Sequence, residues 1–194
     1  MFPRYYVWGG LDFSPDGQRL AFWGGVTKGE QRGLFIGNLE TGDARRLPVE
    51  TVGITRNYVV WSPDGRWLAY TTPGTDVEHD FPVHNLYLID LETDEIEQIT
   101  SDEHYERVYD WSPDGKTIVL WSSRSQGHLT FLYDVASGAF TPVDSDRMVF
   151  DGRWLPDGRL QYQTRDMLYL MNADGSNRHR LFDARHSFCG GGGE

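Results

Sequence analysis

A chain of 194 residues in which 39% are hydrophobic and 14% aromatic can bury a core, which excludes an intrinsically disordered protein. A net charge of −11 and the lack of a basic stripe argue against nucleic acid as a partner, and no apolar run is long enough to insert into a membrane. The single cysteine, Cys189, rules out an intrachain disulfide.

The first residues, MFPRYYVWGGLDF, lack the basic segment, apolar run and small-residue cleavage site of a signal peptide. The sequence as written therefore predicts a soluble cytoplasmic protein. The protein would be extracytoplasmic if a signal peptide had been removed.

Four short segments repeat along the chain. They read FSPDG, WSPDG, WSPDG and WLPDG, and they begin at Phe13, Trp61, Trp111 and Trp154, at intervals of 48, 50 and 43 residues. Proline sets φ near −65° and glycine accepts a positive φ, so each segment predicts a tight hairpin turn. The aromatic residue before each turn is expected to be buried.

A turn accounts for every residue of these segments at once. We therefore favour it over the alternative that the repeated aspartates are metal ligands or catalytic acids. These aspartates are Asp16, Asp64, Asp114 and Asp157.

Further strands follow each turn in chain order. The second strands contain LAFW, LAYT, IVLW and LQYQ, and the third strands end at Asn38, Asp90, Asp134 and Asn172. Nine residues after each of these lies an aliphatic residue of a fourth strand, namely Leu47, Ile99, Val143 and Leu181. The pattern predicts an all-β protein, a β-propeller of four four-stranded antiparallel blades. We expect the propeller over residues 1–183, with blades at 6–47, 56–99, 106–143 and 149–182, and a flexible Gly-rich tail over 184–194.

The repeated SPDG turns, with LAF or LAY, LYLID or LYLMN, and NADGSNRHRL, resemble the TolB-like propeller repeat over residues 8–182. This repeat also occurs in the propeller domains of prolyl-oligopeptidase-type peptidases. Such propellers usually have about six to eight blades. The resemblance therefore leaves three possibilities open: a closed four-bladed ring, a ring completed by a homodimer, or a longer protein with additional blades. We favour the last.

Function is expected on the face that carries the loops between second and third strands, because these loops differ in length from blade to blade. Three tyrosines at this end of the blades, Tyr58, Tyr105 and Tyr109, are candidate ligand-binding residues, although packing explains them as well. His79, Asp80, His84 and His104 are candidate metal ligands, although acidic loops with scattered histidines are more often solvated surface.

The sequence contains no Gly-x-Ser-x-Gly nucleophile elbow, phosphate-binding glycine loop or His-Glu-x-x-His segment. We therefore expect a non-catalytic module, without a cofactor, that binds a protein, peptide or glycan. The alternatives are the propeller part of a serine peptidase and a small metal-dependent lyase or hydrolase that uses the histidine cluster.

Overall fold

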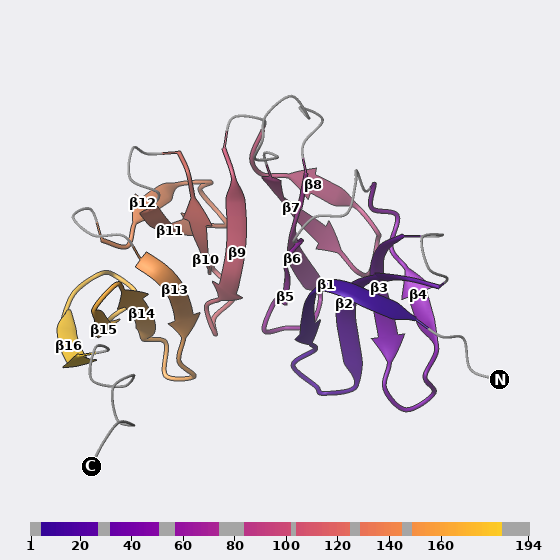
Figure 1. The fold of residues 1–194 in the computed structure, drawn as a ribbon, viewed down its shortest axis with the longest axis horizontal. Helices are drawn as coiled ribbons and strands as arrows, with labels where there is room; N and C mark the ends of the chain where they lie inside the picture. The colour runs from indigo at the N-terminus through magenta and orange to yellow at the C-terminus, as the bar shows by residue number, and fades with distance from the viewer. Residues whose placement is uncertain are drawn as a thin grey trace, which may run out of the picture. The chain divides into compact units, whose positions relative to one another are not determined.

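The computed structural model describes residues 5–26, 32–50, 57–73, 84–101, 104–124, 129–144 and 149–183. Within these ranges every regular element is a β-strand, and the strands form four antiparallel sheets of four (Figure 1). The chain divides into two compact units, Met1–Val108 and Tyr109–Glu194, with the boundary inside β9. The predicted all-β fold of four four-stranded blades is confirmed.

The first unit contains blades 1 and 2, and in each the strands follow one another in sequence order. The strands of blade 1 are β1 (Tyr6–Phe13), β2 (Arg19–Gly25), β3 (Gly33–Asn38) and β4 (Ala44–Arg46). Those of blade 2 are β5 (Val59–Trp61), β6 (Trp67–Pro73), β7 (His84–Asp90) and β8 (Ile96–Gln98).

The second unit contains blade 3 from Tyr109 onward and blade 4, built in the same order. The strands of blade 3 are β9 (Glu106–Trp111), β10 (Thr117–Ser122), β11 (Leu129–Asp134) and β12 (Phe140–Pro142). Those of blade 4 are β13 (Val149–Trp154), β14 (Leu160–Thr164), β15 (Met167–Met171) and β16 (His179–Asp183).

The SPDG segments form the hairpin turns between the first and second strands. In blade 1, the Gly17 N–H donates to the Ser14 carbonyl at 2.8 Å, and Asp16 Oδ1 accepts the Gln18 N–H at 2.9 Å. The turn glycines all have positive φ, with +67° at Gly17, +71° at Gly65, +71° at Gly115 and +83° at Gly158. Each turn aspartate therefore stabilises the turn that contains it, in agreement with the turn interpretation.

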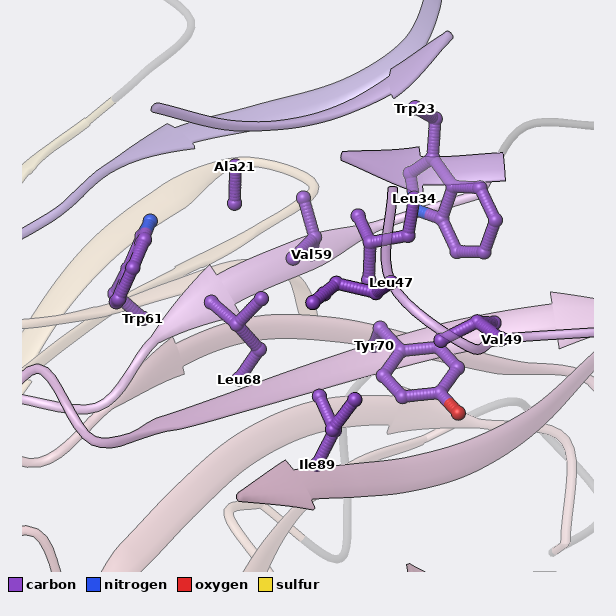
Figure 2. Packing of buried hydrophobic residues seen from close by; sticks show 10 residues of the cluster. All are labelled: Ala21, Trp23, Leu34, Leu47, Val49, Val59, Trp61, Leu68, Tyr70 and Ile89. Atoms are coloured by element: carbon purple, nitrogen blue, oxygen red, sulfur yellow. The ribbon is translucent and has the colours of Figure 1, made fainter. Parts of the chain in front are cut away.

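Each blade buries one face against its neighbour within the unit. In the first unit, Ala21, Trp23 and Leu34 of blade 1 form a core with Leu68 and Tyr70 of blade 2 (Figure 2). In the second unit, a corresponding core is built from Val119, Val143, Val149, Trp154, Leu160, Tyr162 and Met171. Neither blade of a unit could bury this surface alone, which is why the blades stack.

A stacked aromatic pair recurs on the second and third strands. Three blades carry it in the same register, with ring centroids 5.6 Å apart for Phe22 and Phe35, 5.3 Å for Tyr70 and Tyr87, and 5.2 Å for Tyr162 and Tyr169. Cross-strand aromatic pairs of this kind stabilise a sheet, so the repeat extends to pairwise packing inside three of the four blades.

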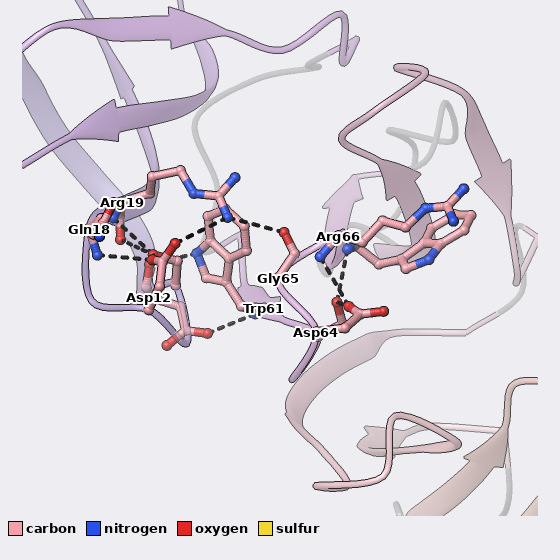
Figure 3. Close-up of polar contacts among 11 residues, drawn as sticks. Asp12, Gln18, Arg19, Trp61, Asp64, Gly65 and Arg66 are labelled. Carbon is pink, nitrogen blue, oxygen red and sulfur yellow. Dashed lines mark hydrogen bonds and ion pairs between the residues drawn. The ribbon is translucent and has the colours of Figure 1, made fainter.

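One carboxylate in each unit joins the two blades. Asp12 of β1 accepts the Trp61 N–H through Oδ2 at 2.7 Å, and its carbonyl accepts the Trp61 indole N–H at 3.0 Å (Figure 3). In the second unit, Asp110 Oδ2 accepts the Trp154 N–H at 2.9 Å. The backbone of the motif tryptophan is thereby tied to the preceding blade.

The expected burial of the motif aromatics is wrong for one of the four. Trp61, Trp111 and Trp154 are only 5%, 6% and 8% exposed, whereas Phe13 is 57% exposed. Trp61 and Trp154 pack on the preceding blade of their own unit, whereas Phe13 belongs to neither of these two cores.

Candidate functional site

The loop end of blade 2 is the end at which β6 stops, β7 starts and the chain enters β9. Here the Arg107 guanidinium lies over the ring of Tyr58, with 4.5 Å between Cζ and the ring centroid. Both side chains are half-buried. A guanidinium stacked on a tyrosine ring forms a cation–π contact, which holds the two side chains together at this end of the blade.

A second aromatic contact lies beside the first in sequence. The ring of Tyr105 meets the ring of His84 edge to face at 4.5 Å, and the two residues form an isolated parallel bridge between their backbones. His84 is 2% exposed, whereas Tyr105 is half-buried. The buried ring of His84 therefore packs against the more exposed ring of Tyr105.

The strand period brings these contacts together. Tyr105 and Arg107 are two residues apart at the start of β9, so their side chains leave the same face of the strand. Glu106, between them, points to the opposite face and is completely buried. We call the set Tyr58, His84, Tyr105 and Arg107 the blade 2 aromatic surface.

Buried hydrogen bonds hold Tyr58 in place. Its N–H donates to Thr71 Oγ1 at 3.2 Å, and its carbonyl accepts the Thr71 N–H at 3.0 Å and the Trp23 indole N–H at 3.4 Å. The residue before it, Asn57, accepts the Gly10 N–H at 2.8 Å. The aromatic surface thus rests on a rigid backbone, as a binding site requires.

Glycine is required at position 10 because the backbones approach so closely. A Cβ at Gly10 would lie 2.9 Å from the Asn57 carbonyl oxygen and 3.0 Å from Tyr58 Cα. The close approach of β1 to the segment entering β5 therefore positions Tyr58.

The predicted site residues fall into three groups. Tyr58, His84 and Tyr105 belong to the aromatic surface. Tyr109 lies in the second unit, where its hydroxyl donates to the Phe150 carbonyl at 2.7 Å, so packing accounts for it. His79 and Asp80 lie outside the described residues.

The predicted metal site is not assembled by the residues that can be placed. His104 is half-buried, and the ring of buried His84 packs against Tyr105. Among the described residues, no three His, Cys, Asp or Glu side chains come together as ligands. A site that also used His79 and Asp80 remains an expectation from sequence.

Sequence reasoning missed Arg107. A signal for it was present in YERVYD, where Tyr105, Arg107 and Tyr109 alternate at every second residue of a predicted strand. Asn57 and Thr71 gave no comparable signal, because their roles depend on backbone contacts between strands distant in sequence.

The turn aspartates lie at the other end of the blades, and their electrostatics are those of structural groups. The Ser14 hydroxyl and the Gln18 N–H hold the pKa of Asp16 below its ordinary value. The Ser112 hydroxyl and the Lys116 N–H have the same effect on the pKa of Asp114. Carboxylates held ionised in this way are poor general acids near neutral pH.

Four-stranded antiparallel blades that follow one another along the chain define a β-propeller protein, and the blade 2 aromatic surface is its candidate binding site. The family described as prolyl oligopeptidase, N-terminal beta-propeller domain, matches residues 3–187, and the chain belongs to this family. The predicted membership of the TolB-like and prolyl-oligopeptidase propellers is thereby confirmed.

Individual relatives agree with this assignment. The Tol-Pal system protein TolB of Anaeromyxobacter dehalogenans (strain 2CP-C) is 34% identical over 76 residues, which are 37% of this chain and 18% of that protein. The structure of an Agrobacterium tumefaciens protein assigned as a TolB aligns with a TM-score of 0.71 and 24% identity, over 90% of this chain and 64% of that one.

A peptidase propeller is similar as well. The β-propeller domain of the trilobed protease from Pyrococcus furiosus, described as having an open velcro topology, aligns with a TM-score of 0.63 and 15% identity. The alignment covers 89% of this chain and 54% of that one. The chain thus spans less than two thirds of these relatives, and the structural similarities establish the fold alone.

The described residues contain no helix that is both long enough and apolar enough to span a bilayer.

Proposed function

We propose that this propeller domain is a non-catalytic module that binds a polypeptide segment through the blade 2 aromatic surface. The observation that carries the proposal is the stack of Arg107 on Tyr58 beside the contact of Tyr105 with His84. Tyrosine and arginine are enriched in the energetically dominant parts of protein interfaces.

The rigidity of the surface supports this assignment. The backbone N–H and carbonyl of Tyr58 make three hydrogen bonds, and the buried ring of His84 packs against Tyr105. A preorganised surface loses little conformational entropy when a ligand binds. The TolB relative belongs, by its name, to a system of several proteins, which favours a protein or peptide ligand over a glycan.

A selection from a random peptide library tests the proposal. Enriched peptides are expected to bind the wild-type chain and to lose at least about tenfold in affinity on Arg107→Ala or Tyr58→Ala. Arg124→Ala is a matched control, because Arg124 stacks on Phe140 at 3.4 Å in the second unit, and it should bind like wild type. Equal affinity of wild type and Arg107→Ala would refute the site.

The family match favours a second candidate, a propeller that accompanies a serine-peptidase catalytic domain encoded outside these 194 residues. This role predicts that an antibody against the chain detects a native polypeptide much larger than 22.2 kDa that also reacts with a fluorophosphonate probe. A native polypeptide of 22.2 kDa that does not react would eliminate this candidate.

A further inference from the structure

The second unit contains a groove at the turn end of its blades, the end opposite to the loops. Its volume is about 420 Å³, within the range of small-ligand sites. Leu132, Val143 and Met171 form an apolar floor between blades 3 and 4. Val143 and Met171 are each 2% exposed, so the floor belongs to the core of the unit.

Two carboxylates stand at the rim of the groove, Asp134 from the end of β11 and Asp174 from the turn after β15. The Ser137 hydroxyl lowers the pKa of Asp134, and Ser176 does the same for Asp174, so both are ionised at neutral pH. Oδ1 of Asp134 accepts the Ser137 N–H at 2.8 Å and the Ser137 hydroxyl at 2.6 Å.

The cationic side chain that lines the groove is already neutralised. Arg178 Nη1 lies 3.2 Å from Asp144 Oδ2, and Nη2 donates to the Val143 carbonyl at 2.7 Å. Asp144 is only 2% exposed, whereas the Arg178 side chain is 38% exposed, so the buried carboxylate holds this guanidinium at the surface. Asp134 and Asp174 therefore leave the groove with a net negative charge.

The first unit shows what the equivalent groove contains when it is filled. There Arg19 lies over the ring of Trp61 at 4.7 Å and donates to the Gly65 carbonyl at 3.3 Å (Figure 3). Arg45 Nη1 binds both carboxylate oxygens of Asp94, at 2.9 and 2.8 Å. Two guanidinium groups of the protein itself thus lie between blades 1 and 2.

The second unit has small residues at the corresponding positions of the repeat. Counting from the SPDG turns and from the ends of the third strands, Arg19 corresponds to Thr117, Arg45 to Thr141 and Leu91 to Ala173. All three small residues line the groove. The larger side chains at these positions in the first unit are thus replaced by smaller ones here, while carboxylates remain at the rim of the groove.

We propose that this groove binds an arginine side chain from a partner polypeptide. The guanidinium would lie between Asp134 and Asp174, where carboxylates accept its planar fork of N–H donors, and the aliphatic stem would cover Leu132 and Met171. Thr117 and Thr141 offer hydroxyl groups along the wall. This surface is distinct from the blade 2 aromatic surface and does not depend on it.

A capped pentapeptide with one arginine among glycines tests the proposal by NMR titration. The arginine peptide is expected to shift the Met171 methyl signal and the Thr117 and Thr141 amides saturably, whereas a peptide with alanine at that position should not. A lysine peptide should bind more weakly, because an ammonium cannot engage two carboxylates through a planar fork. Equal binding of the lysine peptide would overturn the arginine assignment.

Variants test the location. Asp174→Asn should weaken binding about tenfold, and the double variant Thr117→Arg, Ala173→Leu should abolish it by restoring side chains like those of the first unit. Asp94→Asn is the matched control in the filled groove and should leave binding unchanged. The proposal fails if no saturable shift occurs, or if Asp174→Asn binds the arginine peptide as wild type does.

Discussion

The bond between Asp12 and Trp61 gives the sharpest test of how the blades are joined. Asp12 Oδ2 accepts the Trp61 N–H at 2.7 Å, and Trp61 is 5% exposed. Asp12→Ala leaves this N–H without its acceptor at a site that water hardly reaches. Hydrogen bonds to charged groups contribute roughly 1.5–3 kcal/mol, so we expect a loss of about 2 kcal/mol in the free energy of unfolding.

The measurement is urea unfolding followed by tryptophan fluorescence, with the midpoint lowered and the denaturant slope unchanged. Asp12→Asn keeps an acceptor oxygen at the same place and should lose less than half as much. Asp110→Ala should lose at least as much as Asp12→Ala, because Asp110 accepts the N–H groups of both Trp111 and Trp154, each at 2.9 Å. The reasoning is refuted if Asp12→Ala lies within about 0.5 kcal/mol of wild type, or if Asp12→Asn is equally destabilised.

Three further changes probe packing and charge. Gly10→Ala should destabilise the chain by roughly 1–3 kcal/mol in thermal melts, because its Cβ meets backbone, whereas Gly37→Ala, whose Cβ would find nothing closer than 3.4 Å, should change little. The bond from Arg66 lowers the pKa of Asp90, so this carboxylate stabilises the fold above about pH 4 and stops doing so as the pH falls. Urea midpoints measured across this pH range should therefore decline less in Asp90→Asn than in wild type. Burial raises the pKa of Tyr162 to about 12, so the free energy of unfolding should fall between about pH 10 and pH 12. Unfolding curves measured in alkaline buffers should show a smaller fall in Tyr162→Phe.

The fold was predictable because short sequence segments specify each hairpin and because these segments occur in four copies. The SPDG turns, the short apolar strands and the fixed interval to the fourth strand each specify one hairpin, and the four copies confirm one another. The same reasoning was wrong for Phe13, because the turn beside a motif aromatic does not determine whether other residues cover its ring.

The candidate sites were less predictable because they depend on which side chains meet across blades. Tyr58 and Tyr105 could be chosen from their positions before the motif tryptophans. Their contacts with Arg107 and His84 became clear only from the structure. Because the SPDG turns are nearly identical in all four copies, the sequence did not suggest a site at the turn end of the blades. The groove of the second unit lies there, at positions where the copies differ.

The residue that can join a blade to the next by a hydrogen bond differs from blade to blade. The residue before the motif aromatic is Asp12 in blade 1 and Asp110 in blade 3, but Val60 in blade 2 and Arg153 in blade 4. An aspartate at this position accepts the N–H of the next blade's tryptophan, and the chain forms this bond once within each unit. Val60 has no acceptor to offer, and the Trp111 N–H is bonded instead by Asp110 beside it. Asp12 and Asp110 thus each join two blades inside one compact unit. The groove proposed for arginine lies within one such pair, between blades 3 and 4, so its shape depends on how these two blades are joined.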